Sequence, residues 1–323
     1  MRRTPYYGMA DSTTRALAER RASQVRSSRR GRRHTGWRGR KHRTGEARVS
    51  QRYVHGYHHR EGERLRDQAG TLVELLHGDT AYPPGSEVLE AGCGVGAQTV
   101  TLARRSPGAR FTAIDLSFES VATAEAAATA AGVGNVLFRK ADLLAPPFGP
   151  GSFDHVFVCF VLEHLSRPDT ALATLARLLR PGGTMTVIEG DHGSVLFHPD
   201  SAAARDAVQC QVTLQKRAGG DALIGRRVYP LMVGAGLRDI RVSPRLVYAD
   251  ASRPDLVDGF ITRTFTAMIA GVRDAAVAAG LAEAQAFDAG LRDLRRTAGP
   301  DGTFCYTFFK GVGVRASASM PAV

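Results

Sequence analysis

The sequence predicts an α/β fold in which helices cover both faces of a mostly parallel sheet. Strand-like and helical stretches alternate from residue 87 to residue 190. The strand-like stretches are largely apolar, as expected where helices cover both faces of a parallel sheet. The first of them ends in a glycine-rich turn that leads directly into a helical stretch. Together these observations favour an open, doubly covered sheet.

The expected strands and helices follow from the period of the apolar residues. The expected strands are Glu87–Gly92, Phe111–Asp115, Val136–Asp142, Phe153–Phe160, Thr184–Gly190, Asp239–Tyr248 and Thr303–Gly311. The expected helices are Ala97–Arg105, Phe118–Ala131, Asp169–Leu179, Ser201–Arg217, Gly225–Ala235 and the long stretch Pro254–Arg296. Two segments, 191–236 and 250–300, are therefore predicted to be insertions that form a helical cap over the sheet and bind the acceptor.

The net charge of +12 lies entirely in residues 1–48. That segment holds fifteen Lys or Arg residues against three acids, whereas residues 49–323 hold 28 of each. A segment so poor in apolar residues cannot form a core, which predicts a disordered arm ahead of one domain over 49–323. Two interpretations of the arm are open. It binds nucleic acid, or translation starts near Val49 and the arm is not native; the neutral body favours the second.

The remaining bulk features predict a cytoplasmic protein. No apolar run reaches the roughly 18 residues that a membrane span needs, and the N-terminus lacks the apolar segment of a secretion signal. The four cysteines are far apart in the sequence and include no C-x-x-C pair. They are expected to be free thiols, as is usual in a reducing compartment.

The strongest chemical signal is the segment VLEAGCGVGAQTV, residues 88–100. Gly92, Gly94 and Gly96 allow a tight turn that brings bare backbone against a ligand. The same pattern also fits a dinucleotide-binding turn, so an NAD-dependent oxidoreductase is an alternative. Glu90 argues against that alternative, because its carboxylate would repel a pyrophosphate but attract the cationic end of S-adenosylmethionine.

Two further acids end the next two predicted strands. Asp115 can accept hydrogen bonds from both hydroxyls of a ribose, and Asp142 can accept one from an adenine amino group. Either residue alone could be a solvent-facing acid at a strand end. Because the carboxyl ends of parallel strands meet at one edge of a sheet, Glu90, Asp115 and Asp142 are expected to converge on one site for an adenosyl cofactor.

These motifs resemble the class I S-adenosylmethionine-dependent methyltransferases, most strongly over residues 57–190. The matching segments are LEAGCGVG, AIDLS, KADLLAPPF, SFDHVFVCFVLEHL and LLRPGGTMTVIEG. The resemblance implies a Rossmann-like sheet of seven strands whose last strand is antiparallel, with S-adenosyl-L-methionine as cofactor. It implies that Gly92, Gly94 and Asp115 hold the cofactor. It also places further residues at that site: Tyr57, Arg64, Gln98, Thr99, Leu116, Leu143, Cys159 and Glu163.

The segment EGDHGS at the end of the fifth predicted strand offers candidate catalytic groups. His192 is predicted to be a general base, with Glu189 or Asp191 orienting its ring, although the same residues are also common in plain turns. His55 is a further candidate. The fourth strand is not followed by the N/D-P-P-Y/F pattern of enzymes that methylate amino groups of nucleic acids. No His-Asp pair suited to a metal is evident, so no metal is expected.

The acceptor is predicted to be a small molecule. The segments YVHGYHHRE, VIEGDHGS and TFCYTFFKG resemble a bacterial group that includes indole carbon-3 methyltransferases of secondary metabolism. This resemblance implies methylation of carbon in an aromatic or indole-type intermediate, whose N–H would interact with His192, Glu189 or His55. The alternative is an RNA or other nucleic-acid methyltransferase tethered by residues 1–48. No membrane partner is expected, and a homo-oligomer is left open.

Overall fold

The computed structural model describes residues 70–316 of the 323-residue chain. The predicted arm over residues 1–48 and the predicted site residues His55, Tyr57 and Arg64 therefore lie outside the described residues. Residues 70–77 form the first described helical segment. None of the helices between residues 70 and 316 is long and apolar enough to cross a membrane.

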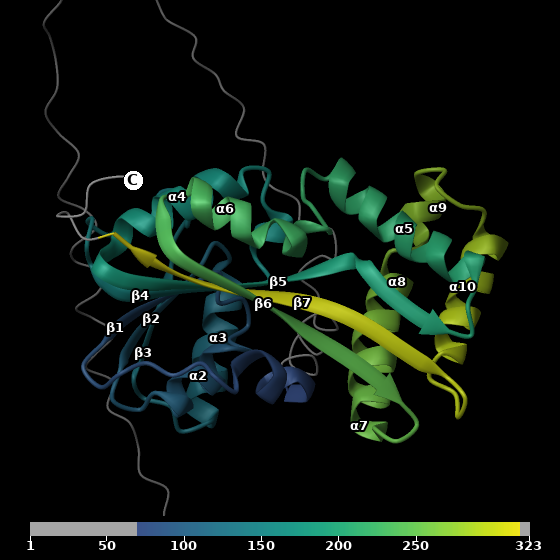
Figure 1. The fold of residues 1–323 in the computed structure, drawn as a ribbon, viewed down its shortest axis with the longest axis horizontal. Helices are drawn as coiled ribbons and strands as arrows, with labels where there is room; N and C mark the ends of the chain where they lie inside the picture. The colour runs from purple at the N-terminus through teal and green to yellow at the C-terminus, as the bar shows by residue number, and fades with distance from the viewer. Residues whose placement is uncertain (1–69, 317–323) are drawn as a thin grey trace, which may run out of the picture. The chain divides into compact units, whose positions relative to one another are not determined.

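One sheet of seven strands forms the centre of the fold, in the order β3-β2-β1-β4-β5-β7-β6 (Figure 1). The strands are β1 (Glu87–Ala91), β2 (Arg110–Asp115), β3 (Val136–Lys140), β4 (Phe153–Cys159), β5 (Leu179–His198), β6 (Leu237–Asp250) and β7 (Thr303–Arg315). Strands β1 to β5 pair in parallel, whereas β7 is antiparallel to both β5 and β6. The predicted Rossmann-like sheet with an antiparallel last strand is confirmed. Its strand order reverses between β1 and β4, where such sheets bind ligands.

Helices cover both faces of the parallel half of the sheet (Figure 1). On one face lie α2 (Thr99–Arg105) and α3 (Phe118–Ala130); on the other lie α4 (Pro168–Leu178) and α6 (Val228–Gly234). Because successive side chains of a strand point to opposite faces of the sheet, β1 contributes side chains to the cores on both faces. Val88 packs in the same core as Leu102 of α2, and Leu89 packs in the same core as Leu172 of α4.

The C-terminal half departs from the prediction in two places. Strand β5 does not end at Gly190 but continues to His198, where it pairs with the first residues of β7. The first part of the predicted 191–236 insertion therefore belongs to the sheet. The predicted helical stretch Pro254–Arg296 is divided into five pieces: α7 (Pro254–Leu256), the π-helical η3 (Val257–Thr266), α8 (Ala267–Gly271), α9 (Arg273–Ala278) and α10 (Ala284–Arg296). The remaining helices are α5 (Ala202–Arg217) and the 3₁₀ turns η1 (Leu162–His164) and η2 (Ile224–Arg227).

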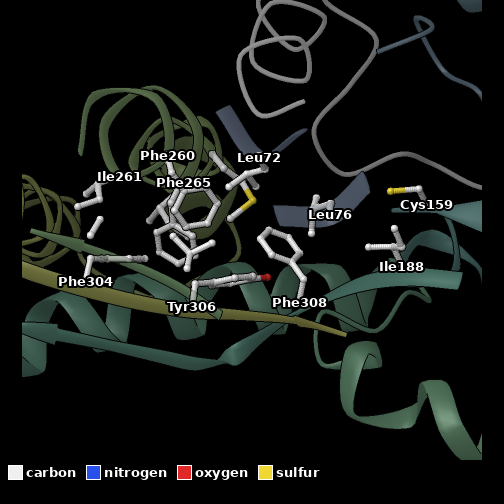
Figure 2. Close-up of a cluster of buried hydrophobic side chains, with 14 of the residues drawn as sticks. Leu72, Leu76, Cys159, Ile188, Phe260, Ile261, Phe265, Phe304, Tyr306 and Phe308 are labelled. Atoms are coloured by element: carbon white, nitrogen blue, oxygen red, sulfur yellow. The ribbon is translucent and has the colours of Figure 1, made fainter. Parts of the chain in front are cut away.

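An aromatic core joins η3 to the outer half of β7 (Figure 2). Phe304, Tyr306 and Phe308 alternate along β7 and point to the same side, toward Phe260 and Phe265 of η3. All five rings are buried, and the ring centres of Tyr306 and Phe308 are 4.8 Å apart. Burial of each such ring contributes about 1.5–3 kcal/mol. Packing of these rings therefore holds η3 against the sheet.

A buried lysine fixes the end of the first described helical segment to the sheet. Lys310 of β7 is only 3% exposed, and its ammonium donates to the Asp79 carboxylate at 2.6 Å, the Thr80 hydroxyl and the Leu76 carbonyl. Arg245 of β6 also contacts Asp79. Although partial burial raises the pKa of Asp79, hydrogen bonds from Lys310 and Arg245 lower it to about 2.

This ion pair predicts an acid-dependent loss of stability. The pKa of Asp79 is lower in the folded chain than its ordinary value of 3.8, so its stabilising effect is complete above that value and disappears as pH falls through about 2. We expect the free energy of unfolding of wild type to exceed that of Asp79→Asn near neutral pH, and this difference to become smaller below pH ~4. Urea unfolding of both proteins at a series of pH values measures the difference. A difference that stays constant down to acid pH would contradict the assignment of this ion pair.

Candidate cofactor and acceptor site

The glycine turn after β1 leaves an open space in front of Gly94. Gly92, Gly94 and Gly96 all have positive φ angles, of 82°, 52° and 78°. A Cβ atom on Gly92 would lie 2.5 Å from Val161, and one on Gly96 would lie 2.9 Å from Ala124, so packing requires both glycines. A Cβ atom on Gly94 would meet nothing within 4 Å among the described residues. That side of the turn is therefore free to receive a ligand.

Asp115 connects the end of β2 to this turn. Its Oδ2 accepts a hydrogen bond of 2.9 Å from the Gly94 amide, and its Oδ1 accepts one of 2.9 Å from the Ser117 amide. The two oxygens together have about four acceptor positions, so the carboxylate can still accept from ligand hydroxyls. Beside it, the Leu116 side chain is 58% exposed although it is apolar. Such an exposed apolar surface is suited to contact with a flat ring.

Asp142 lies next to Asp115 at the same edge of the sheet. The amide of Ala141 donates to the Asp115 carbonyl, which brings the two strand ends together. The exposed carboxylate of Asp142 accepts one hydrogen bond from the Leu144 amide, and Leu143 beside it is half-buried. The predicted convergence of Asp115 and Asp142 is thus present in the structure.

Glu90, near the end of β1, is a buried acid at the centre of this edge. Its side chain is 3% exposed, and its Oε2 has no hydrogen-bond partner among residues 70–316. Burial raises the pKa of Glu90 to about 8; a hydrogen bond with the Thr99 side chain partly offsets this rise, and the neighbouring charge of Asp115 adds to it. A buried ionised carboxylate is costly, so a cationic ligand is the kind of group that would stabilise it.

The ends of β4 and β5 bring a second acid pair to the same edge. Glu189 of β5 is fully buried, and its Oε1 accepts hydrogen bonds from the amides of Val161 and Leu162. Burial, reinforced by nearby Glu163, raises the pKa of Glu189 well above its ordinary value. The predicted site residue Cys159 is also buried here. Phe160, which follows it, has a φ of 57°, a strained angle for a non-glycine residue that is typical of functional sites.

The two predicted residues that follow the glycine turn are both buried. Thr99 is the first residue of α2 and is completely buried. Gln98 accepts, through its Oε1, a 2.6 Å hydrogen bond from Nε2 of His77. Burial lowers the pKa of His77 to about 4, so this ring is neutral at physiological pH. This hydrogen bond uses the amide oxygen of Gln98 and not its amide nitrogen.

The predicted catalytic group of β5 is arranged differently from the expectation. Nδ1 of His192 shares a 2.7 Å hydrogen bond with the Tyr306 hydroxyl, and its ring packs at 6.1 Å from Phe265. Asp191 instead forms a two-point ion pair with Arg226 at 2.6 and 2.9 Å. Glu189 binds backbone amides, as described above. Glu189 or Asp191 was predicted to orient the His192 ring. In the structure, the Tyr306 hydroxyl is bonded to Nδ1 of that ring.

Comparison with known proteins agrees with this geometry. Residues 88–183, from β1 to the start of β5, match the family model described as a methyltransferase domain.

The chain carries a class I S-adenosylmethionine-dependent methyltransferase domain.

Relatives of this methyltransferase domain are similar over part of their length. An uncharacterized 37.1 kDa protein in transposon TN4556 of Streptomyces fradiae is 35% identical over 191 residues, which cover 58% of this chain and 54% of that protein. A demethylmenaquinone methyltransferase of Thermus thermophilus is 36% identical over 102 residues, which cover 32% of this chain and 46% of that enzyme. The chain thus spans about half the length of these curated relatives.

A solved structure has the same fold as this methyltransferase domain. The crystal structure of a candidate methyltransferase from Bacillus halodurans C-125 has a TM-score of 0.50 and 14% sequence identity. The similarity covers 76% of this chain and 99% of that one. At this level of identity the similarity supports the fold of the domain and not its acceptor.

Sequence reasoning missed Tyr306, Arg226 and His77. Each acts through a partner that is distant in the sequence: Tyr306 lies 114 residues from His192, and Arg226 lies 35 residues from Asp191. The alternation of Phe304, Tyr306 and Phe308 was a usable signal, because it places Tyr306 on the buried face of β7. A buried tyrosine needs a hydrogen-bond partner, and a histidine on the neighbouring strand was a natural candidate. Among residues 70–316, no group of three or more His, Cys, Asp or Glu side chains is placed to hold a metal ion.

Proposed function

We propose that this protein transfers the methyl group of S-adenosyl-L-methionine to a small aromatic acceptor. One observation carries the proposal. The open turn at Gly94, the Asp115 carboxylate and the buried acid Glu90 meet at the carboxyl edge of the sheet, where the strand order reverses.

The described residues fit this cofactor. Asp115 would hold the ribose hydroxyls, Leu116 and Leu143 would contact the adenine ring, and Asp142 would accept from its amino group. Glu90 would face the cationic amino-acid end, and Gln98 would donate its amide hydrogens there. The buried Oε2 of Glu90, which accepts no hydrogen bond from any residue between 70 and 316, supports a cationic group at this place. His55, Tyr57 and Arg64 remain proposals from the sequence alone.

When bound, the cofactor supplies a methyl group that its positive sulfur has already activated. The protein's task is then mainly to align donor and acceptor for in-line displacement and to exclude water. The turn at Gly94 and the Asp115 carboxylate would fix the donor. The helical parts of residues 199–236 and 250–300, including η3 with Phe260 and Phe265, are proposed to form the acceptor cap. His192, oriented by Tyr306, would accept or share the acceptor's proton.

An aromatic acceptor, with methylation at carbon as in an indole, fits the surroundings of His192. The ring centre of His192 is 5.8 Å from that of Tyr306 and 6.1 Å from that of Phe265. Aromatic side chains favour stacked or edge-on contact with another flat ring. The named Thermus relative methylates demethylmenaquinone, a small molecule, which supports a small-molecule acceptor here.

Asp115→Ala is expected to weaken S-adenosylhomocysteine binding by about 2–3 kcal/mol, because it removes two charge-assisted hydrogen bonds to the ribose. Isothermal titration calorimetry measures the change. Asp115→Asn is the matched control: it keeps an acceptor for the Gly94 amide and should lose less affinity. If the folded alanine variant binds as tightly as wild type, the ribose is held elsewhere.

The acceptor is tested with methyl-labelled S-adenosylmethionine. We expect label to enter an indole or another small aromatic compound when a panel of such compounds is incubated with the protein. The same assay with cell extract covers acceptors that the panel lacks. Label entering RNA and no small molecule would overturn the proposal.

A further inference from the structure

His77 and Gln98 form a buried polar pair beside the glycine turn. His77 ends the first described helical segment, and Gln98 stands immediately before α2, two residues after Gly96. Both side chains are buried. The 2.6 Å hydrogen bond between Nε2 of His77 and Oε1 of Gln98 joins residues that are 21 positions apart in the sequence. It thus connects the start of α2 to the helical segment that precedes the sheet.

This pair lies near the place where the strand order reverses. The His77 ring packs against Phe157 of β4, with ring centres 5.7 Å apart. Phe157 is opposite Glu90 of β1 in the strand register, and it packs in the same core as Val88. Side chains two residues apart in a strand share a face, so Glu90 points to the same side of the sheet as Val88. His77 therefore lies over the junction of β1 and β4, on the face that carries Glu90.

The hydrogen bond fixes the orientation of the Gln98 amide. A glutamine oxygen can only accept, so Nε2 of His77 must carry the single proton of the neutral ring. The last torsion of a glutamine side chain is broad and roughly two-fold, so a glutamine that lacks such a partner can exchange its oxygen and nitrogen at little cost. In Gln98 this exchange would lose the bond to His77. The position of the NH2 group is therefore defined as well.

The amino-acid end of the proposed cofactor carries an ammonium and a carboxylate. The ammonium suits Glu90, as proposed above, whereas the carboxylate needs hydrogen-bond donors. We propose that His77 is a positioning residue: by holding Oε1 of Gln98, it presents the NH2 group to the carboxylate of the bound cofactor. This inference rests on the proposed function and adds a group that selects the amino-acid end of the ligand.

The experiment compares two ligands in calorimetric titrations of the full chain. S-Adenosylhomocysteine contains the amino-acid end, whereas 5′-methylthioadenosine keeps the adenosine and the thioether but lacks that end. The ratio of the two dissociation constants therefore isolates the contribution of the amino-acid end. We expect wild type to bind S-adenosylhomocysteine more tightly than 5′-methylthioadenosine.

His77→Phe keeps a flat ring against Phe157 and removes the donor to Gln98. We expect the affinity for S-adenosylhomocysteine to fall about 5- to 30-fold, because a freed amide no longer holds its NH2 group toward the carboxylate. The affinity for 5′-methylthioadenosine should stay within about twofold of wild type. His77→Gln supplies an amide donor again and should recover most of the loss. A loss that His77→Gln does not reduce would contradict the role of the donor.

Gln98→Met shows whether His77 acts through Gln98. The methionine has a similar length but no amide, so this variant alone should lower the ratio as His77→Phe does. Adding His77→Phe to it should then change the ratio no further, because the partner is already absent. A further fall of the ratio in the double variant would show that His77 acts by another route, which would overturn the proposal.

His155→Phe is the matched control. His155 of β4 is a second histidine whose ring nitrogen shares a short hydrogen bond with a side chain, at 2.7 Å from Oγ1 of Thr184. It lies two residues before Phe157, toward the amino end of the strand and away from the glycine turn. This substitution removes a comparable bond and should leave the ratio of the two dissociation constants unchanged.

A measurement on wild type serves if His77→Phe does not fold. The side-chain NH2 signals of Gln98, assigned in nitrogen-15 spectra by their absence in Gln98→Met, should shift on addition of S-adenosylhomocysteine. Addition of 5′-methylthioadenosine should leave them nearly unchanged. Signals that respond equally to both ligands, or to neither, would overturn the proposal.

The outcomes separate this inference from the proposed function. If wild type binds neither ligand, the proposed function fails, and this inference fails with it. If wild type binds both but His77→Phe keeps the wild-type ratio, or weakens both ligands alike, only this inference fails. Equal affinity of wild type for the two ligands would also overturn it, because the amino-acid end would then contribute nothing.

Discussion

Gly94→Val is expected to abolish S-adenosylhomocysteine binding while leaving the chain folded. A side chain at this position meets no described residue within 4 Å, so it would project into the space proposed for the cofactor. A steric conflict of about 3 kcal/mol or more corresponds to a loss of at least about 100-fold in affinity. The positive φ of 52° adds local strain of about 1–3 kcal/mol, which a domain of this size can tolerate.

Gly132→Val is the matched control for this substitution. Gly132 has a similar φ of 68°, and a side chain there also meets nothing within 4 Å, but it follows α3 and is not part of the glycine turn. It should cost similar stability and leave binding unchanged. Titration calorimetry and thermal unfolding measure the two effects separately. If Gly94→Val binds the ligand within about threefold of wild type, the open space is not the cofactor site.

His192→Ala is expected to lower the rate of methyl transfer at saturating substrates by about 10²–10⁴-fold, the usual contribution of a positioned general base. Affinity for S-adenosylhomocysteine should stay near the wild-type value, because His192 is proposed to act on the acceptor and not on the donor. Single-turnover measurements with labelled donor give the transfer rate without the contribution of product release.

Tyr306→Phe separates the orientation of His192 from its chemistry. This substitution keeps the buried ring and removes only the hydroxyl bound to Nδ1 of His192. A smaller loss than in His192→Ala is expected, because the base remains but its ring is no longer held. Equal turnover in wild type, Tyr306→Phe and His192→Ala would show that the reaction proceeds by alignment alone. The aromatic residues around His192 would then serve only to hold the acceptor.

The parallel half of the fold and the cofactor side of the site could be predicted because their signals are local. The strands that end at Glu90–Ala91 and Asp115 were recognised from short apolar runs, and the glycines from their spacing. The hydrogen bond between Asp115 and the Gly94 amide then follows from the side-by-side pairing of β1 and β2. A parallel sheet places the ends of neighbouring strands together, so a local pattern is sufficient there.

The acceptor side could be predicted only in part, because it depends on contacts between distant segments. The continuation of β5 to His198 needs the first residues of β7 as a partner, and nothing in residues 191–198 alone indicates it. Likewise, Asp191 was a reasonable partner for His192 by proximity in the sequence. Side chains of adjacent residues in a strand point to opposite faces, however, so Asp191 meets Arg226 while His192 meets Tyr306.

The central claim is that the turn at Gly94 and the acids around it bind an adenosyl methyl donor. Titration of the wild-type full chain with S-adenosylhomocysteine, and in parallel with NADH, tests it most directly. The account predicts saturable binding of one S-adenosylhomocysteine per chain and no binding of NADH, whose pyrophosphate brings no positive charge to the buried Glu90. Binding of NADH without binding of S-adenosylhomocysteine would contradict it.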